Sequence, residues 1–155
     1  MSNSEKPKDL VFMEGISHLV FNKDFTQCAL SKKDNKIYIY QVKNFNDPNS
    51  WILLHCLKAH FLYVSGLDWC PVTNKIVSCS YDKTCMIWEF VTDKWTGMSL
   101  TATSKLSYLF AKWNVRGDKF VTGTSEKKLF MGYFSSGAGW WTGRNIKGHK
   151  SSVVC

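Results

Sequence analysis

Short segments of alternating apolar and polar residues run along most of the chain, and this pattern predicts β-strands. In residues 64–69 the alternation is that of a half-buried strand, and the turn-forming run Cys70–Asn74 follows it. No segment has an apolar stripe with the 3.6-residue period of a helix. The sequence therefore predicts an all-β protein. The expected strands fall into three groups of four: 16–21, 27–30, 36–40 and 51–56; 64–69, 75–80, 84–88 and 98–103; 109–114, 119–123, 129–134 and 140–146.

The three groups are copies of one repeat. Each copy has an aromatic residue, an acidic residue 13 positions later and a strand-ending residue 6 positions after that. Successive copies are offset by 48 and then 44 residues, a period typical of the four-stranded blade of a WD40 β-propeller. We therefore expect an incomplete WD40 propeller. The three sets are Phe21, Asp34 and Tyr40; Trp69, Asp82 and Trp88; and Trp113, Glu126 and Gly132.

The repeat also predicts where the blades begin and end. Blades are expected near residues 15–60, 61–104 and 105–148, and Gly148-His149 restores the dipeptide that opens a WD repeat, so a fourth blade begins at 149–155. Residues 1–14 are a polar segment in which Leu10–Phe12 is a candidate closing strand. Because propellers close with roughly 4–8 blades, we expect an open arc that depends on a partner or on self-association.

The second copy contains four polar residues at the spacing of the WD hydrogen-bonded tetrad: His60, Ser78, Asp82 and Trp88. Four such groups can be buried together only when each finds a partner, and a satisfied network fixes one geometry. A Ser-His-Asp hydrolase is the competing interpretation, but the chain has no G-x-S-x-G motif. The third copy keeps only part of the set, with Thr122 and Glu126 in place, Ser104 instead of histidine and Gly132 instead of tryptophan.

Composition restricts the class of protein further. At 155 residues with 45% hydrophobic and 15% aromatic content, the chain is predicted to fold rather than to be disordered. It has no apolar run near the roughly 20 residues that cross a bilayer, and its N-terminus lacks a signal peptide, so we expect a cytoplasmic protein, with the nucleus also open. The six cysteines include no C-x-x-C pair, which predicts reduced thiols, no structural metal and no cofactor.

A formal net charge of +8 favours acidic partners. The candidate contacts for an acidic partner are Lys32, Lys33, Lys127 and Lys128, at or beside turns that fall on one face of a propeller. The competing interpretation is that they are ordinary surface lysines. Nucleic acid is not favoured as a partner, because the basic residues are scattered and the aromatic residues fit the strand core.

Four segments in order carry a more specific signal: KDNKIYIY at 33–40, VSGLDWCPVTNKIVSCSYDKTCMIW at 64–88, FAKWNVRGDKFVTGT at 110–124 and WWTGRNIKGHKSSVV at 140–154. Together they resemble the N-terminal part of the WD-repeat subunit family (subunit 1, p41 type) of the actin-related protein 2/3 complex, over roughly residues 16–154. The resemblance implies a seven-bladed propeller without enzyme activity. It also implies contacts with the other subunits of that complex, acting in nucleation of branched actin filaments in the cytoskeleton.

The same resemblance implies that acidic nucleation-promoting factors and the actin filament are further partners. Nothing in this chain corresponds to the family's late-blade insertion that reaches toward actin. Two alternatives therefore stay open at this point. One is a general WD40 scaffold that binds another acidic protein, and the other is a truncated product without a function of its own.

Overall fold

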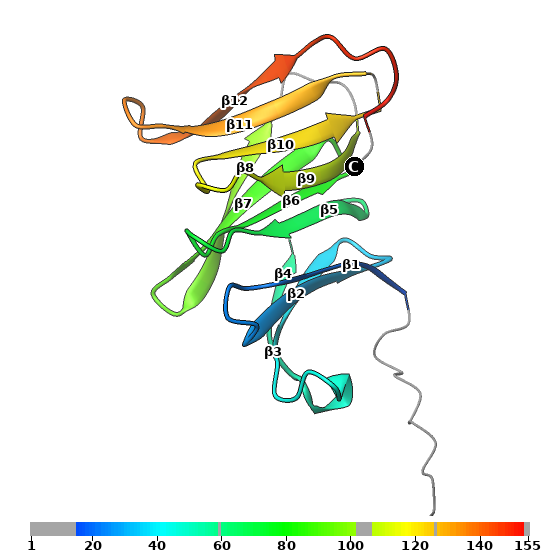
Figure 1. The fold of residues 1–155 in the computed structure, drawn as a ribbon, viewed down its shortest axis with the longest axis vertical. Coiled ribbons are helices and arrows are strands. Elements are labelled where there is room, and N and C mark those ends of the chain that lie inside the picture. Colours follow the sequence, from blue (N-terminus) through cyan, green and yellow to red (C-terminus); the bar gives the residue numbers. More distant parts are fainter. Residues whose placement is uncertain (1–14, 59, 102–106, 126, 154–155) are drawn as a thin grey trace, which may run out of the picture.

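A computed structural model describes residues 15–58, 60–101, 107–125 and 127–153. Twelve strands form three four-stranded antiparallel sheets, and in each sheet the strands are hydrogen-bonded in the order in which they occur in the chain (Figure 1). The prediction of an all-β chain with three four-stranded blades is therefore confirmed. The 3-10 turn η2 (Pro48–Ser50) precedes β4. The strands are β1 (Ile16–Phe21), β2 (Gln27–Lys32), β3 (Lys36–Gln41) and β4 (Ile52–Lys58); β5 (Val64–Trp69), β6 (Ile76–Ser80), β7 (Thr84–Val91) and β8 (Lys94–Thr101); β9 (Tyr108–Trp113), β10 (Lys119–Thr124), β11 (Leu129–Ser135) and β12 (Trp140–Ile146).

We call these the first, second and third sheets. The last strand of the second sheet was predicted at 98–103, but β8 (Lys94–Thr101) begins four residues earlier than the predicted start. Thr92 and Asp93 have φ values of 50° and 60°, so a two-residue hairpin pairs Lys94 with Val91. Such a turn usually carries glycine, asparagine or aspartate, and here only Asp93 is a residue of that kind.

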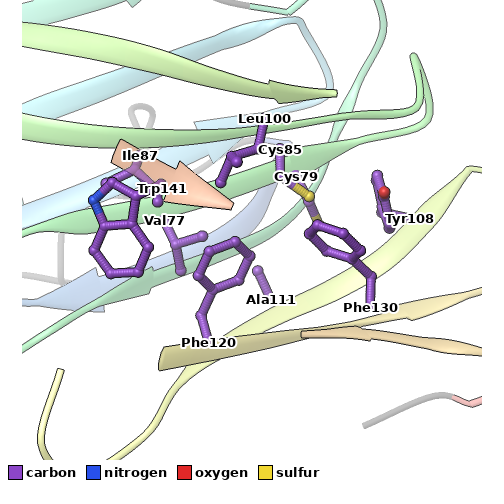
Figure 2. Close-up of a cluster of buried hydrophobic side chains, with 10 residues drawn as sticks. All are labelled: Val77, Cys79, Cys85, Ile87, Leu100, Tyr108, Ala111, Phe120, Phe130 and Trp141. Atoms are coloured by element: carbon purple, nitrogen blue, oxygen red, sulfur yellow. The ribbon is translucent and has the colours of Figure 1, made fainter. Parts of the chain in front are cut away.

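Two layers of apolar side chains hold the sheets face to face. The first layer joins the first and second sheets and includes Ile37, Ile39, Leu67 and Trp88. The second layer joins the second and third sheets (Figure 2). The second sheet is therefore covered on both faces, and all five residues of β6 are buried. The second layer consists of Val77, Cys79, Cys85, Ile87, Leu100, Tyr108, Ala111, Phe120, Phe130 and Trp141.

The innermost strands β1, β5 and β9 lie next to one another and share one irregularity. In each, the pairing register shifts by one residue near its start, at Ser17, Ser65 and Leu109. These positions keep the 48- and 44-residue offsets of the repeat. The Ser65 hydroxyl uses this irregularity to donate a 2.6 Å hydrogen bond to the carbonyl of Tyr108, which joins β5 to β9. The bulge is thus repeated in all three inner strands, and in β5 it provides a joint to the next sheet, whereas the Ser17 hydroxyl bonds within its own sheet.

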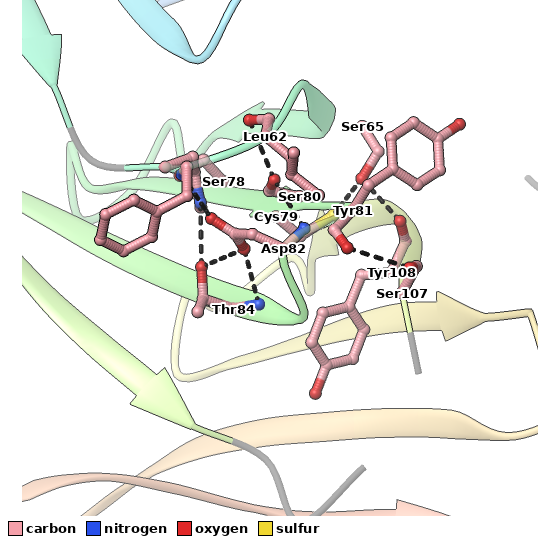
Figure 3. A network of polar contacts seen from close by, with 12 residues as sticks. Leu62, Ser65, Ser78, Cys79, Ser80, Tyr81, Asp82, Thr84, Ser107 and Tyr108 are labelled. Carbon is pink, nitrogen blue, oxygen red and sulfur yellow. Dashed lines mark hydrogen bonds and ion pairs between the residues drawn. The ribbon is translucent and has the colours of Figure 1, made fainter. Parts of the chain in front are cut away.

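A second set of contacts joins each sheet to the start of the next. The backbone N–H of Val64 donates to the carbonyl of Asp34, and the Ser107 hydroxyl donates to the carbonyl of Tyr81 (Figure 3). The Ser152 hydroxyl donates in the same way to Ser125, at 3.1 Å. The chain beyond the third sheet therefore makes the same serine-to-carbonyl contact with which the third sheet begins. The expected fourth blade and the blade limits stay predictions, and Leu10–Phe12 lies outside the described residues.

Candidate functional site

The structure brings together His60, Ser78, Asp82 and Trp88 inside the second sheet. Ser78 lies on β6, Trp88 on β7, Asp82 in the turn between them and His60 in the segment that leads into β5. His60 Nε2 lies 2.9 Å from the Ser78 hydroxyl, and His60 Nδ1 lies 3.2 Å from Asp82 Oδ2. The indole N–H of Trp88 donates to the Ser78 hydroxyl at 3.0 Å. One continuous hydrogen-bonded chain therefore crosses three elements of the sheet.

The chemistry of the end groups fixes the direction of this chain. An indole N–H only donates, and an ionised carboxylate only accepts. The Ser78 hydroxyl therefore accepts from Trp88 and donates to His60 Nε2, while His60 Nδ1–H donates to Asp82. This assignment satisfies every group with a neutral imidazole protonated at Nδ1.

Burial keeps the imidazole neutral. Desolvation lowers the pKa of His60 below its ordinary value of 6.5, and this effect outweighs the opposing attraction of the Asp82 carboxylate. For Asp82 desolvation is again the largest influence and would raise the pKa. The hydrogen bonds from Thr84 and from the N–H of Phe61 reverse this, so that its pKa is lowered overall. At neutral pH the pair is a neutral histidine beside an ionised aspartate.

Thr84, on β7 two residues after Asp82, is a further member that the sequence prediction missed. Its backbone N–H and hydroxyl both donate to Asp82 Oδ1, at 2.9 and 2.5 Å, and its hydroxyl oxygen lies 3.0 Å from His60 Nδ1. A hydroxyl residue two positions after a turn aspartate is the signal that could have identified it, because aspartates commonly bond their own backbone two residues on.

The arrangement has the order of a Ser-His-Asp triad but not its accessibility. Ser78 is fully buried, and the side chain of His60 has no exposed surface. A substrate carbonyl could not reach the Ser78 oxygen without removing the packing above it, and the Trp88 indole already occupies one of its lone pairs. The network therefore fixes the position of β5, β6 and β7 and has no route to acyl chemistry.

The equivalent positions in the other two sheets are occupied differently. In the first sheet, Asp34 accepts from the Tyr38 hydroxyl at 2.7 Å and from the N–H of Lys36. In the third sheet, Thr122 is fully buried, but Gly132 stands where the second sheet has Trp88, so no indole reaches the hydroxyl. Ser104 and Glu126 lie outside the described residues.

The four candidate lysines lie at two turns, and Lys32 is the last residue of β2. Lys32 and Lys33 line a pocket of about 330 Å³ together with the bulge residues of the three inner strands, and the Lys32 ammonium lies 5.1 Å above the Tyr38 ring. Lys127 and Lys128 belong to the turn between β10 and β11 and are not among the residues that line this pocket. A basic surface shared by both pairs stays a prediction. The pocket is lined by Ser17, His18, Lys32, Lys33, Tyr63, Val64, Ser65, Tyr81 and Leu109.

Among the described residues, no cluster of three or more histidine, cysteine or acidic side chains could hold a metal ion. Burial raises the pKa of the Cys79 thiol to about 12 and also raises that of Cys85. Both thiols therefore behave as small core side chains rather than as nucleophiles. None of the described residues forms a helix that is long and apolar enough to cross a membrane.

Comparison with known proteins agrees with this geometry. Residues 51–89 match the WD domain, G-beta repeat family, and this match contains the whole hydrogen-bonded network of the second sheet. Residues 51–89 are a WD repeat. It is 30% identical to actin-related protein 2/3 complex subunit 1A-B of Xenopus laevis over 142 residues, which is 92% of this chain and 37% of that protein.

Relatives from other lineages show the same similarity. Subunit 1A of the complex from Arabidopsis thaliana is 29% identical over 92% of the chain, and subunit 1 from Schizosaccharomyces pombe is 26% identical over 86%. The resemblance to the WD-repeat subunit of this complex is therefore confirmed. The chain spans 37% of the length of the Xenopus and Arabidopsis relatives and 35% of the Schizosaccharomyces protein.

Proposed function

We propose that this chain is a non-catalytic WD-repeat subunit that acts in the nucleation of branched actin filaments through protein–protein contacts. The observation that carries the proposal is similarity over 86–92% of the chain to subunit 1 of the actin-related protein 2/3 complex from a frog, a plant and a yeast. The proposed direct partners are other subunits of such a complex. Acidic nucleation-promoting factors and the actin filament are proposed as indirect partners, and the site of action is the cytoplasmic actin cytoskeleton.

The geometry supports a binding role rather than a catalytic one. The polar constellation that most resembles an active site is buried and fully hydrogen-bonded within the protein. The surface instead exposes several large apolar side chains, among them Phe61 and Trp140, which are 88% and 59% exposed. Exposed aromatic residues in a rigid sheet scaffold are typical of protein interfaces.

The outer face of the third sheet adds a second kind of support. Val77, Cys85 and Ile87 of the second sheet are buried under the third sheet, whereas Val121 and Met131, at the positions of Val77 and Ile87, are only half-buried. The third sheet thus presents the kind of apolar face that its neighbours cover. A face of this kind fits a protein that works inside an assembly.

The test is recovery of the complex from cells that express the tagged full chain. We expect co-purification of actin-related proteins and companion subunits, measured by quantitative mass spectrometry against a tag-only control. The matched variants are Val121→Asp with Met131→Asp on the half-buried face, and Val115→Asp at a position that is 90% exposed. The first pair should lose recovery and the second should keep it.

Two results would contradict the proposal. Failure of the wild-type chain to recover any actin-related protein or companion subunit would exclude it. Recovery dominated by acidic proteins unrelated to actin would favour the general scaffold instead.

A further inference from the structure

The last strand of the second sheet, β8, is an edge strand with little protection against pairing. It pairs with β7 from Lys94, opposite Val91, to Thr101, opposite Thr84, without a bulge. Among the described residues, no strand pairs with its other side. After Lys94 it contains no charged residue and no proline. Natural edge strands usually carry charges, prolines or bulges that keep other chains away, so β8 is open to a further strand.

The other two outer strands are less suited to pairing. The register of β4 shifts next to Leu54, which leaves a bulge in the middle of the strand. In β12 the exposed side chain of Arg144 places a charge within the strand. Among the described residues, β8 is therefore the outer strand that combines a regular register with an uncharged interior.

The backbone groups on the open side of β8 belong to every second residue. The two-residue turn at Thr92–Asp93 closes with a bond between Lys94 and Val91, so Lys94 and every second residue after it bond to β7. The residues between them direct their N–H and C=O groups away from β7: Trp95, Gly97 and Ser99. These three residues therefore offer their backbone groups to a further strand.

A pocket of about 310 Å³ lies beside β8, between the second and third sheets. The second sheet lines it with two cross-strand pairs, Ile87 with Met98 and Glu89 with Thr96, whose side chains share one face of the sheet. The third sheet contributes Trp141, which lies next to Ile87 (Figure 2). Met98 is 44% exposed, so the pocket opens to solvent along β8.

The charge in this pocket is neutralised within the protein. Glu89 is the one charged residue among those that line it. The Lys75 ammonium forms an ion pair with the Glu89 carboxylate and lies 5.7 Å from the centre of the Trp141 ring. A charged side chain that entered would lose its hydration without gaining a new partner. The pocket therefore favours an uncharged apolar side chain.

We propose that β8 accepts an extended segment of another protein as a fifth strand of the second sheet, with one large aliphatic or aromatic side chain of that segment in the pocket beside Trp141. The backbone of the segment bonds to the open side of β8, and every second side chain of the segment faces the pocket. Backbone bonds supply affinity, and the pocket selects the side chain. The site does not depend on assembly of the chain into an actin-nucleating complex.

A second copy of the chain fits this edge less well. In a pair of β8 strands, the side chains on the pocket face would be Thr96 and Met98, which already line the pocket of their own copy. Neither pocket would receive a large side chain. Each copy also carries a formal net charge of +8, and like charges oppose the contact.

The probe is a peptide selected on the tagged full chain from a phage-displayed library of random sequences of about 12 residues, long enough to cover β8. Clones are counter-selected on Ser99→Pro, in which proline removes an N–H on the open side and leaves the bonds to β7 in place. We expect the selected clones to share one large apolar residue among β-branched residues. Binding of the synthetic, fluorescein-labelled peptide is followed by fluorescence anisotropy.

Backbone N-methylation of the selected peptide tests the mode of binding. Alternate N–H groups of a paired strand point toward its neighbour, and the others point away. Methylation should therefore weaken binding by about tenfold or more at every second residue only. A peptide that binds through its side chains alone would not show this period of two.

Variants of the protein test both halves of the site. Ser99→Pro should weaken binding by about tenfold or more, because it blocks the open edge. Met98→Asp should weaken it to a similar degree, because it places a charge in the apolar pocket. The matched controls are Ser99→Ala, which keeps the N–H, and Met98→Leu, and both should bind like wild type. Equal melting temperatures by circular dichroism show that a variant remains folded.

Several results would overturn the inference. These are a selection without clones that distinguish the wild-type chain from Ser99→Pro, an equal effect of N-methylation at every residue, or unchanged affinity in Met98→Asp. Self-association on size-exclusion chromatography that is lost in Ser99→Pro would assign the edge to a second copy. A chain that recovers no complex subunits but binds such a peptide contradicts the proposed function alone, and the reverse result contradicts this inference alone.

Discussion

The second and third sheets fill the same space in the core with a large aromatic ring, but the ring comes from different strands. In the second sheet, Ile76 on β6 pairs with Trp88 on β7, and in the third sheet Phe120 on β10 pairs with Gly132 on β11. The large ring thus moves from one strand to its neighbour. A Cβ atom at Gly132 would lie 2.1 Å from the Phe120 ring, so the phenylalanine occupies the space that a side chain there would need.

The exchange removes a hydrogen bond but keeps the packing. Trp88 fills the core and also donates to Ser78. Phe120 has nothing to donate and instead makes an edge-on contact with Trp113 and a tilted contact with Trp141, at centroid distances of 5.6 and 6.0 Å. One sheet is specified by a polar network and the other by an aromatic cluster. A repeat can therefore lose its characteristic polar residues without losing its sheet, provided that the volume is restored.

The largest loss of stability is expected when Trp88 is replaced. Trp88→Ala removes a ring that is 5% exposed and leaves the Ser78 hydroxyl without its donor, so it should lower the free energy of unfolding by about 4 kcal/mol. The measurement is the urea midpoint followed by circular dichroism. Trp140→Ala, at a tryptophan that is 59% exposed, is the control and should change stability by about 0.5 kcal/mol or less. Similar losses in the two variants would mean that Trp88 is not a core residue.

The second-largest loss of stability is expected when a tryptophan is placed in the third sheet at Gly132. Gly132→Trp alone collides with Phe120 and should cost about 3 kcal/mol. The double variant Phe120→Ile, Gly132→Trp reproduces the pair of the second sheet and offers the Thr122 hydroxyl to the indole, so it should recover at least about half of that loss. If the losses in the free energy of unfolding, measured by urea denaturation, simply added up in the double variant, the side chains at positions 120 and 132 would not be compensating for each other's size.

Asp82 and Asp34, the turn aspartates of the second and first sheets, allow the stability contributed by their hydrogen bonds to be compared. Asp82→Asn removes the charge that accepts from His60, Phe61 and Thr84 and should cost about 2 kcal/mol. Asp34→Asn in the first sheet affects a smaller set of bonds and should cost about 1 kcal/mol or less. Thermal melting of both variants in one buffer measures the difference. An equal or larger loss for Asp34→Asn would show that the network around Asp82 adds no stability.

The smallest effect is a pH dependence. Because the pKa of His60 is lowered in the folded protein, the unfolded chain binds more protons below the ordinary value of 6.5. Stability should be complete above pH 6.5 and should fall as the pH decreases from 6.5 toward the lowered pKa. His60→Gln should reduce this slope. His18→Gln is measured in parallel, because burial and Lys112 lower the pKa of His18 as well.

Nuclear magnetic resonance measures the pKa of His60 directly. The ring protons of His60 should titrate with a midpoint below 6.5. A midpoint above 6.5 would mean that the Asp82 carboxylate outweighs desolvation, and the expected slope would then reverse its sign.

Most of the fold could be predicted because the strands follow from the pattern of residues that are close together in the sequence. Strand alternation and the fixed offsets between repeats placed nearly every strand, since each sheet forms from neighbours in the chain. The start of β8 was missed because its hairpin turn contains no glycine or asparagine, and because Thr92 adopts a positive φ that a β-branched residue rarely takes. The proximity of His60, Ser78, Asp82 and Trp88 was expected from spacing, whereas Thr84 was found only from its distances to Asp82 and His60.

The sequence by itself determined a repeating all-β chain, its relation to the WD-repeat subunit and the residues of the polar network. Tertiary structure alone decided that the Ser78 and His60 side chains are buried and that Phe120 replaces the missing tryptophan. It also decided that Tyr63 and Tyr81 line one pocket with Lys32 and Lys33. The physical reason is that periodicity is a property of neighbours along one strand. Burial and the meeting of distant turns depend on how one sheet lies against the next.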